Sequence, residues 1–201
     1  MKMKFIKKCN ELIMWYGDDY IKRKNGTLLL KPGKIPKAQH IIYAPLSKEL
    51  IEEHLIKAYK NKMPEEYVNL LSHFNGMTLY MVKVNYNKKF TFASSRLNIF
   101  GLPLTPTSLR PEYGEEPIDV RMMDLERHVE ISQSWLKVGC YRKDMNEDIQ
   151  YDIFIDTNNN RVFCCKHRTA EIDEEWDSLD DCFCDIFDYL STTEWEFDIQ
   201  G

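Results

Sequence analysis

Residues 63–76 contain a helix whose beginning and end are both marked in the sequence. Pro64 suits the first helical position, because its missing N–H would have no partner there. The apolar side chains that follow it have helical spacing and form one stripe: Tyr67, Leu70, Leu71 and Phe74. Gly76 can adopt the left-handed conformation that ends a helix. After it the period changes to two, with Tyr80, Val82, Val84 and Tyr86 on one face, which predicts a strand.

Two helices and a hairpin are predicted before this helix. Residues 3–15 have apolar side chains at helical spacing and predict a helix that Gly17 ends. Asn25-Gly26 lies between two apolar runs and predicts a hairpin with a type I′ turn. Prolines then predict a connecting loop up to Pro45, and Ser47 is the expected N-cap of a second helix.

The second half of the chain predicts strands followed by a last helix. Residues 135–139 read as a strand, and residues 151–166 as a hairpin that turns at Asp156–Asn160. Residues 101–118 read as a long irregular loop and residues 124–134 as a short helix. The last helix follows a Ser178 cap, with an apolar stripe of Leu179, Cys182, Phe183, Ile186, Phe187 and Leu190. We therefore expect a single α+β domain, with a mostly antiparallel sheet flanked by N-terminal helices and a C-terminal amphipathic helix.

The order of these patterns resembles the SUKH superfamily, which includes yeast cell-wall-assembly regulators and many bacterial immunity proteins. The resemblance rests on the proline-started helix that ends in Asn75-Gly76 and leads directly into a strand, and on the later run Ile99-Phe100-Gly101-Leu102. It spans roughly residues 45–190. Met77 stands where this family often has a second glycine. We expect residues 46–201 to form a SUKH-like domain with an acidic C-terminal tail, and residues 1–45 to be an N-terminal extension, a helix plus a hairpin, packed on the core.

The sequence offers no pattern for catalysis, a cofactor or a metal. It has no Gly-rich phosphate loop, no Gly-x-Ser-x-Gly motif and no His-Glu-x-x-His pair. The six cysteines lack the spacing of a zinc site, and we expect them to be reduced. No apolar run is long enough to span a membrane, and the N-terminus has no export signal. We therefore expect a cytoplasmic protein that is not an enzyme and needs no cofactor.

The charge is distributed unevenly along the chain. Residues 1–60 hold 13 Lys and Arg against 6 Asp and Glu, whereas residues 171–201 hold 12 Asp and Glu and no Lys or Arg. Such a block attracts a basic protein partner and repels nucleic acid. The predicted contact residues in it are Glu174, Trp176, Asp177, Asp180, Asp181 and Trp195. The alternative is that both tryptophans complete the core while the acids are merely solvated.

The resemblance implies an immunity protein that binds and neutralises a cognate toxin domain, expected to be a nuclease. An acidic surface would then occlude the basic cleft with which a nuclease holds phosphate. The alternative is a regulatory or scaffolding interaction module of the same superfamily that neutralises no toxin.

Overall fold

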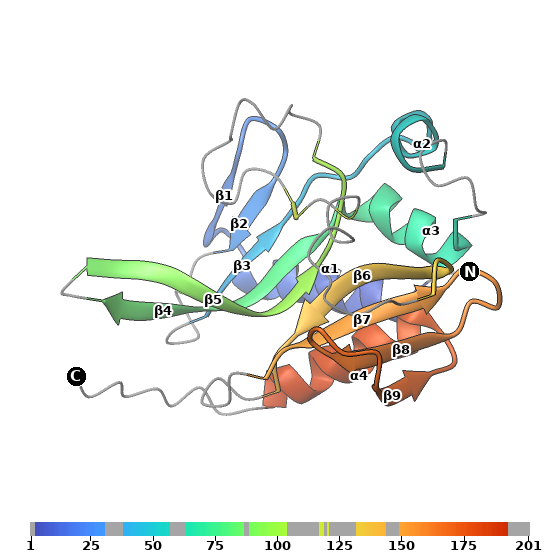
Figure 1. Cartoon of the computed structure of the whole chain (residues 1–201). Helices are drawn as coiled ribbons and strands as arrows, with labels where there is room; N and C mark the ends of the chain where they lie inside the picture. The colour runs from blue at the N-terminus through green and yellow to red at the C-terminus, as the bar shows by residue number, and fades with distance from the viewer. Residues whose placement is uncertain are drawn as a thin grey trace.

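The fold is a single meandering sheet with helices at both ends of the chain (Figure 1). The computed structural model describes residues 3–30, 38–56, 63–86, 89–103, 117–118, 120, 132–143 and 149–192. In chain order the elements are α1 (Lys4–Tyr16), β1 (Tyr20–Lys22), β2 (Leu28–Leu30), β3 (Ala38–Ile42), α2 (Lys48–Ile51) with a π-helical turn (Glu52–Ile56), α3 (Glu65–His73), β4 (Met77–Tyr86), β5 (Lys89–Ile99), β6 (Trp135–Tyr141), β7 (Tyr151–Asp156), β8 (Val162–Lys166), β9 (Ile172–Trp176) and α4 (Leu179–Thr192). The predicted α+β fold is confirmed.

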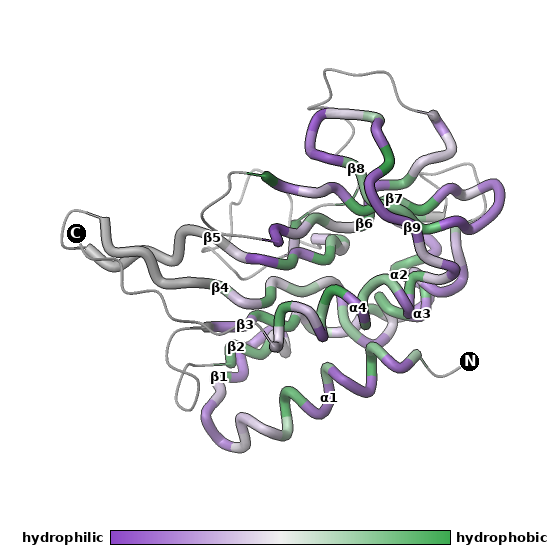
Figure 2. The backbone as a smooth tube through the Cα atoms, turned by 90° about the horizontal axis from the view of Figure 1, so that it is seen from below, coloured by the Kyte–Doolittle hydropathy of each residue, from purple (hydrophilic) through white to green (hydrophobic). Residues whose placement is uncertain are grey.

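In the part of the chain that the structure describes, nine antiparallel strands lie in sequence order, and β1 and β9 are the two edges of the sheet. Helices α1, α3 and α4 share one core with one face of this sheet. Phe5 of α1 and Phe183 of α4 lie at its centre, with ring centroids 5.2 Å apart. Figure 2 shows α1 alternating between hydrophobic and hydrophilic residues, as expected for a helix that buries one stripe. Two smaller apolar clusters, one around Ile41 and one around Phe154, lie on the other face of the sheet.

The predicted helix signals are largely confirmed. Gly17 follows α1 with a positive φ of 56°, and the hydroxyl of Ser47 accepts a hydrogen bond from the Leu50 N–H. All six residues of the predicted α4 stripe are buried. One detail is wrong by a residue: Pro64 is the N-cap of α3, with an extended ψ of 127°, and Glu65 is the first helical residue.

The hairpin at Asn25-Gly26 is confirmed, but its predicted turn type is wrong. Gly26 has a positive φ of 88°, whereas Asn25 has a negative one, and a type I′ turn needs both to be positive. The Gly26 N–H donates to the Arg23 carbonyl and the Arg23 N–H donates to the Thr27 carbonyl, both at 2.9 Å. This is a type I turn followed by a glycine bulge.

Strands β3 and β9 were not predicted. Strand β3 lies between Pro36 and Pro45, within the segment predicted to be a loop, and it joins β2 to β4. Residues 3–30 and 38–45 therefore belong to the same sheet and core as the rest of the chain. Most of the predicted 101–118 loop and of the predicted 124–134 helix lies outside the described residues.

Candidate protein-binding surface

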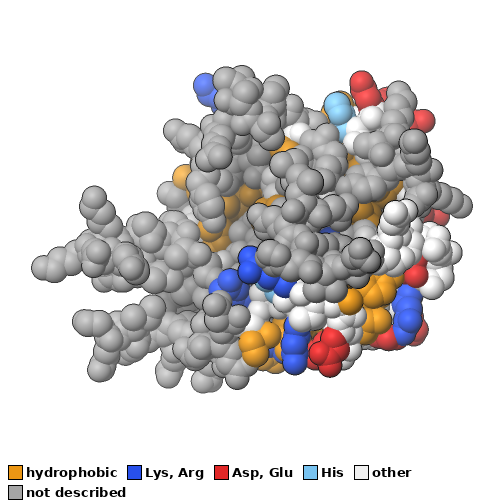
Figure 3. All heavy atoms as spheres, viewed as in Figure 1, with side chains coloured by type: hydrophobic (Ala, Val, Ile, Leu, Met, Phe, Trp, Pro, Cys, Tyr) orange, Lys and Arg blue, Asp and Glu red, His pale blue; other side chains and the backbone are white. Residues whose placement is uncertain are grey.

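The acidic segment predicted to bind a partner forms β9 and the start of α4. Within the described residues β9 pairs with β8 alone, so its other side is an edge of the sheet. Residues 172–176 alternate between half-buried and exposed, and three of the five are acidic. Figure 3 shows acidic and basic side chains close together over the region where Figure 1 places β8, β9 and α4.

The acids of β9 have basic partners on neighbouring elements. Lys143 Nζ forms an ion pair with Glu174, and it lies 3.5 Å from the Asp173 carboxylate. Partial burial lowers the pKa of Lys143, but the hydrogen bond to Glu174 and the nearby carboxylates raise it by more, and the pKa is raised overall. Arg161 Nε donates to Glu175 at 3.0 Å, and this hydrogen bond lowers the pKa of the Glu175 carboxyl. Much of the predicted negative field of β9 is therefore compensated within the chain.

The structure corrects the role predicted for Asp180. Its side chain is buried, with 5% exposed, and its two carboxylate oxygens accept the backbone N–H groups of Lys4 at 2.9 Å and Phe5 at 2.8 Å. These are the first amides of α1, which have no partner within that helix. Asp180 thus caps α1 from a position 175 residues away from Phe5, and its carboxylate is not available to a partner.

The other predicted contact residues differ in their exposure and in the hydrogen bonds that they already make. Asp181 accepts a hydrogen bond from the Ser178 hydroxyl at 2.6 Å and lies 3.5 Å from Lys4 Nζ. Trp176 is half-buried against the main core, and its Nε1–H donates to Asp185 at 3.1 Å. Trp195 lies outside the described residues. Asp177 is exposed and faces a cleft.

This cleft, about 270 Å³ in volume, lies where α3 and α4 begin. Its lining residues are Pro64, Glu65, Glu66, Ile155, Asn160, Val162, Asp177, Ser178 and Leu179. Ile155, Val162 and Leu179 are buried and make its floor apolar, whereas Glu65 and Asp177 are exposed. Glu66 accepts the Leu179 N–H at 2.8 Å and so caps α4.

The cleft combines an apolar floor with carboxylates and two helix N-termini. Among the described residues, the carboxylates of Glu65 and Asp177 form no ion pair, unlike those of β9. The helix N-termini do not favour a cation, but the start of α4 is already capped by Glu66. The exposed carboxylates match a Lys or Arg side chain, because its aliphatic stem packs on apolar surface while its cationic head binds carboxylates. In the sequence alone, Glu65 and Glu66 are acids in the first turn of a helix, where they favour its start. Their meeting with Asp177 depends on tertiary packing across more than a hundred residues.

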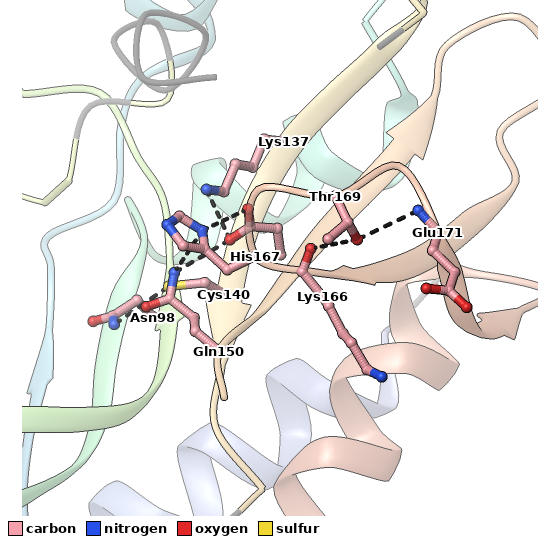
Figure 4. Close-up of polar contacts among 9 residues, drawn as sticks. Asn98, Lys137, Cys140, Gln150, Lys166, His167, Thr169 and Glu171 are labelled. Carbon is pink, nitrogen blue, oxygen red and sulfur yellow. Dashed lines mark hydrogen bonds and ion pairs between the residues drawn. The ribbon is translucent and has the colours of Figure 1, made fainter. Parts of the chain in front are cut away.

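A second polar cluster, absent from the predictions, lies at β6, β7 and the end of β8 (Figure 4). The Asp152 carboxylate lies 2.8 Å from Lys137 Nζ and 2.9 Å from His167 Nδ1. Gln150 Nε2 also donates to Asp152, at 3.2 Å. Lys137 and Asp152 are nearly fully buried. Since both carboxylate oxygens are already engaged, this network satisfies a buried ion pair and leaves no free base at Asp152.

Comparisons with known proteins identify no relative of this chain: no protein-family model, no curated protein and no solved structure matches it. Within the described residues, no group of three or more His, Cys, Asp and Glu is placed to hold a metal ion. No helix among them is long and apolar enough to cross a membrane.

Proposed function

We propose that this chain is a SUKH-type immunity protein that binds a basic toxin domain in the cytoplasm and blocks its active site. The observation that carries the proposal is the cleft at the start of α3 and α4, where Glu65 and Asp177 flank an apolar floor. A basic side chain of the partner, from the cleft with which a nuclease holds phosphate, would enter it.

Two further observations support the proposal. The residues on which the superfamily resemblance rests contact one another, since the Tyr67 hydroxyl donates to the Phe100 carbonyl at 3.0 Å. The edge strand β9, with three consecutive acids at Asp173, Glu174 and Glu175, leads directly into Asp177 of the cleft and adds polar side chains beside it. Inhibition by such a surface is stoichiometric and needs no cofactor or turnover.

The test uses the C-terminal domain of any large secreted protein encoded beside this chain. Glu65→Gln combined with Asp177→Asn removes the two exposed carboxylates of the cleft with little change in shape. We expect binding at least about tenfold weaker, with a flatter salt dependence and loss of protection from the toxin. The matched control is Glu52→Gln with Glu53→Gln, which removes two exposed carboxylates from the π-helical turn after α2.

Equal affinity and salt dependence for the cleft variant and the control would overturn the cleft as the contact site. A chain that binds no neighbouring toxin domain, and whose deletion leaves resistance unchanged, would overturn the immunity function and favour the regulatory or scaffolding alternative.

A further inference from the structure

The sheet edge opposite β9 carries an exposed apolar patch. All three residues of β1, Tyr20, Ile21 and Lys22, are exposed, and among the described residues β1 pairs with β2 alone. Met14 and Trp15 in the last turn of α1 are 69% and 45% exposed, and Ile21 is 43% exposed. An apolar patch beside an unpaired strand edge is a feature of association surfaces.

The outward backbone groups of β1 belong to Tyr20 and Lys22. Arg23 donates its N–H to the Thr27 carbonyl across the hairpin at 2.9 Å, so the backbone N–H and C=O groups of Arg23 point toward β2. In an antiparallel pair, the backbone N–H and C=O groups of successive residues point alternately toward the partner strand and away from it. Ile21, which is opposite Leu29, therefore also faces β2, and the N–H and C=O groups of Tyr20 and Lys22 point out from the edge.

The charges around β1 are self-complementary. Asp18 and Asp19 precede the strand, and Arg23 and Lys24 follow it. If a second copy pairs antiparallel with Ile21 opposite Ile21, Tyr20 of one copy meets Lys22 of the other. Asp18 and Asp19, before the strand, then come near Arg23 and Lys24, after it, in the other copy. Charges on a strand edge commonly oppose association. Here the two signs stand on opposite sides of the strand, so antiparallel pairing brings opposite charges together.

We propose that the chain forms a symmetric dimer through antiparallel pairing of β1 with β1 of a second copy. The outward groups of Tyr20 and Lys22 fit this register, because they would exchange N–H···O=C bonds with Lys22 and Tyr20 of the other copy. Ile21 would pack on its counterpart at the two-fold axis, next to the cluster to which Leu29 belongs. Like charges at the symmetry-related positions never meet, so the two-fold arrangement is electrostatically favourable.

This dimer is independent of the proposed partner surface. The cleft lies beside β9, whereas the dimer uses β1 at the opposite edge of the sheet. One dimer would therefore present two acidic clefts, and its loss would leave each cleft intact.

The test is sedimentation of the full chain over a range of concentrations, with two single-sign variants. The first, Asp18→Lys with Asp19→Lys, makes the edge entirely basic. The second, Arg23→Glu with Lys24→Glu, makes it entirely acidic. In each variant alone, like charges oppose one another across the two-fold axis, and we expect dimerisation to weaken at least about tenfold.

The decisive measurement is an equal mixture of the two variants. The entirely basic edge of one variant then faces the entirely acidic edge of the other, so opposite charges again lie near each other and we expect the mixture to dimerise about as well as the original chain. Circular dichroism and the midpoint of thermal unfolding verify that each variant is folded. A wild-type chain that stays monomeric at every concentration would overturn the proposal. A dimer that neither variant weakens, or that mixing fails to rescue, would place the interface elsewhere and would also overturn it.

Discussion

Asn75 pairs with Leu102 through two hydrogen bonds of equal length: the Leu102 N–H donates to Asn75 Oδ1, and Asn75 Nδ2 donates to the Leu102 carbonyl, both at 2.7 Å. Asn75 is 4% exposed, so neither bond can be replaced by bulk water. Its carboxamide imitates one residue of a β-ladder and ties the end of α3 to the segment after β5. Through this contact, two parts of the sequence pattern that are far apart along the chain, Asn75 at the end of α3 and the Ile99–Leu102 run, lie side by side in the structure.

Asn75→Ala is expected to destabilise the protein by about 2–4 kcal/mol, because it leaves two buried backbone groups of Leu102 without partners. Chemical denaturation measures the loss. Asn158→Ala is the matched control, since Asn158 is exposed in the β7–β8 turn and its backbone N–H keeps its bond to Asp156. A loss for Asn75→Ala no larger than that of the control would contradict this role.

Gly101 lies against the same asparagine. A Cβ at Gly101 would stand 2.3 Å from the Asn75 carbonyl oxygen, closer than atoms can approach. We expect Gly101→Ala to cost about 3 kcal/mol or more, since the backbone must move to relieve the overlap. Gly17→Ala is the control: apart from its chain neighbours, no atom of the described residues lies within 4 Å of its Cβ position, and its positive φ of 56° alone predicts a cost of about 1 kcal/mol. Equal losses would show that the contact with Asn75 is unimportant.

The sequence predicted the elements whose signals are local. The helices α1, α3 and α4 follow from apolar stripes and caps, because a helix buries residues that are close in sequence. Strand β9 has three acids in five residues, and it is held by pairing with β8 and by ion pairs to Lys143 and Arg161. Those contacts are made by residues that the sequence does not place nearby.

The candidate site also contains one residue whose exposure agrees with the sequence prediction and one whose burial depends on distant contacts. Asp177 was predicted as a contact residue from charge alone, and it lines the cleft. Asp180 carries the same charge but is buried under α1. Composition cannot separate these two acids, because the difference arises where the first and last helices of the chain meet.

Asp180 therefore predicts a stability effect rather than a binding effect. Asp180→Ala removes a buried cap from the first two amides of α1, and we expect a loss of about 2–3 kcal/mol in the free energy of unfolding. Asp181→Ala is the control at the neighbouring exposed carboxylate, and we expect a loss below about 1 kcal/mol. If the two variants lose the same stability, Asp180 does not cap α1 in solution.

His40 on β3 predicts a pH dependence of stability. Its ring is fully buried between Tyr16 and Tyr80, Nδ1 accepts the Tyr80 N–H at 3.2 Å, and Nε2 has no hydrogen-bond partner among the described residues. Burial lowers the pKa of His40 to about 3, from an ordinary value of 6.5. The neutral ring is therefore the form that the folded protein holds.

Since the pKa of His40 is lower in the folded chain than in the unfolded chain, unfolding takes up a proton between those two values. This part of the stability is fully present above pH 6.5 and is lost as the pH falls toward 3, at up to about 1.4 kcal/mol per pH unit. His40→Gln cannot titrate, so its unfolding free energy should fall less steeply over the same range. The exposed His73→Gln is the control and should keep the original slope. Urea denaturation of the three proteins between pH 4 and 7 measures the slopes, and identical slopes for His40→Gln and the original chain would show that His40 is not the group that takes up the proton.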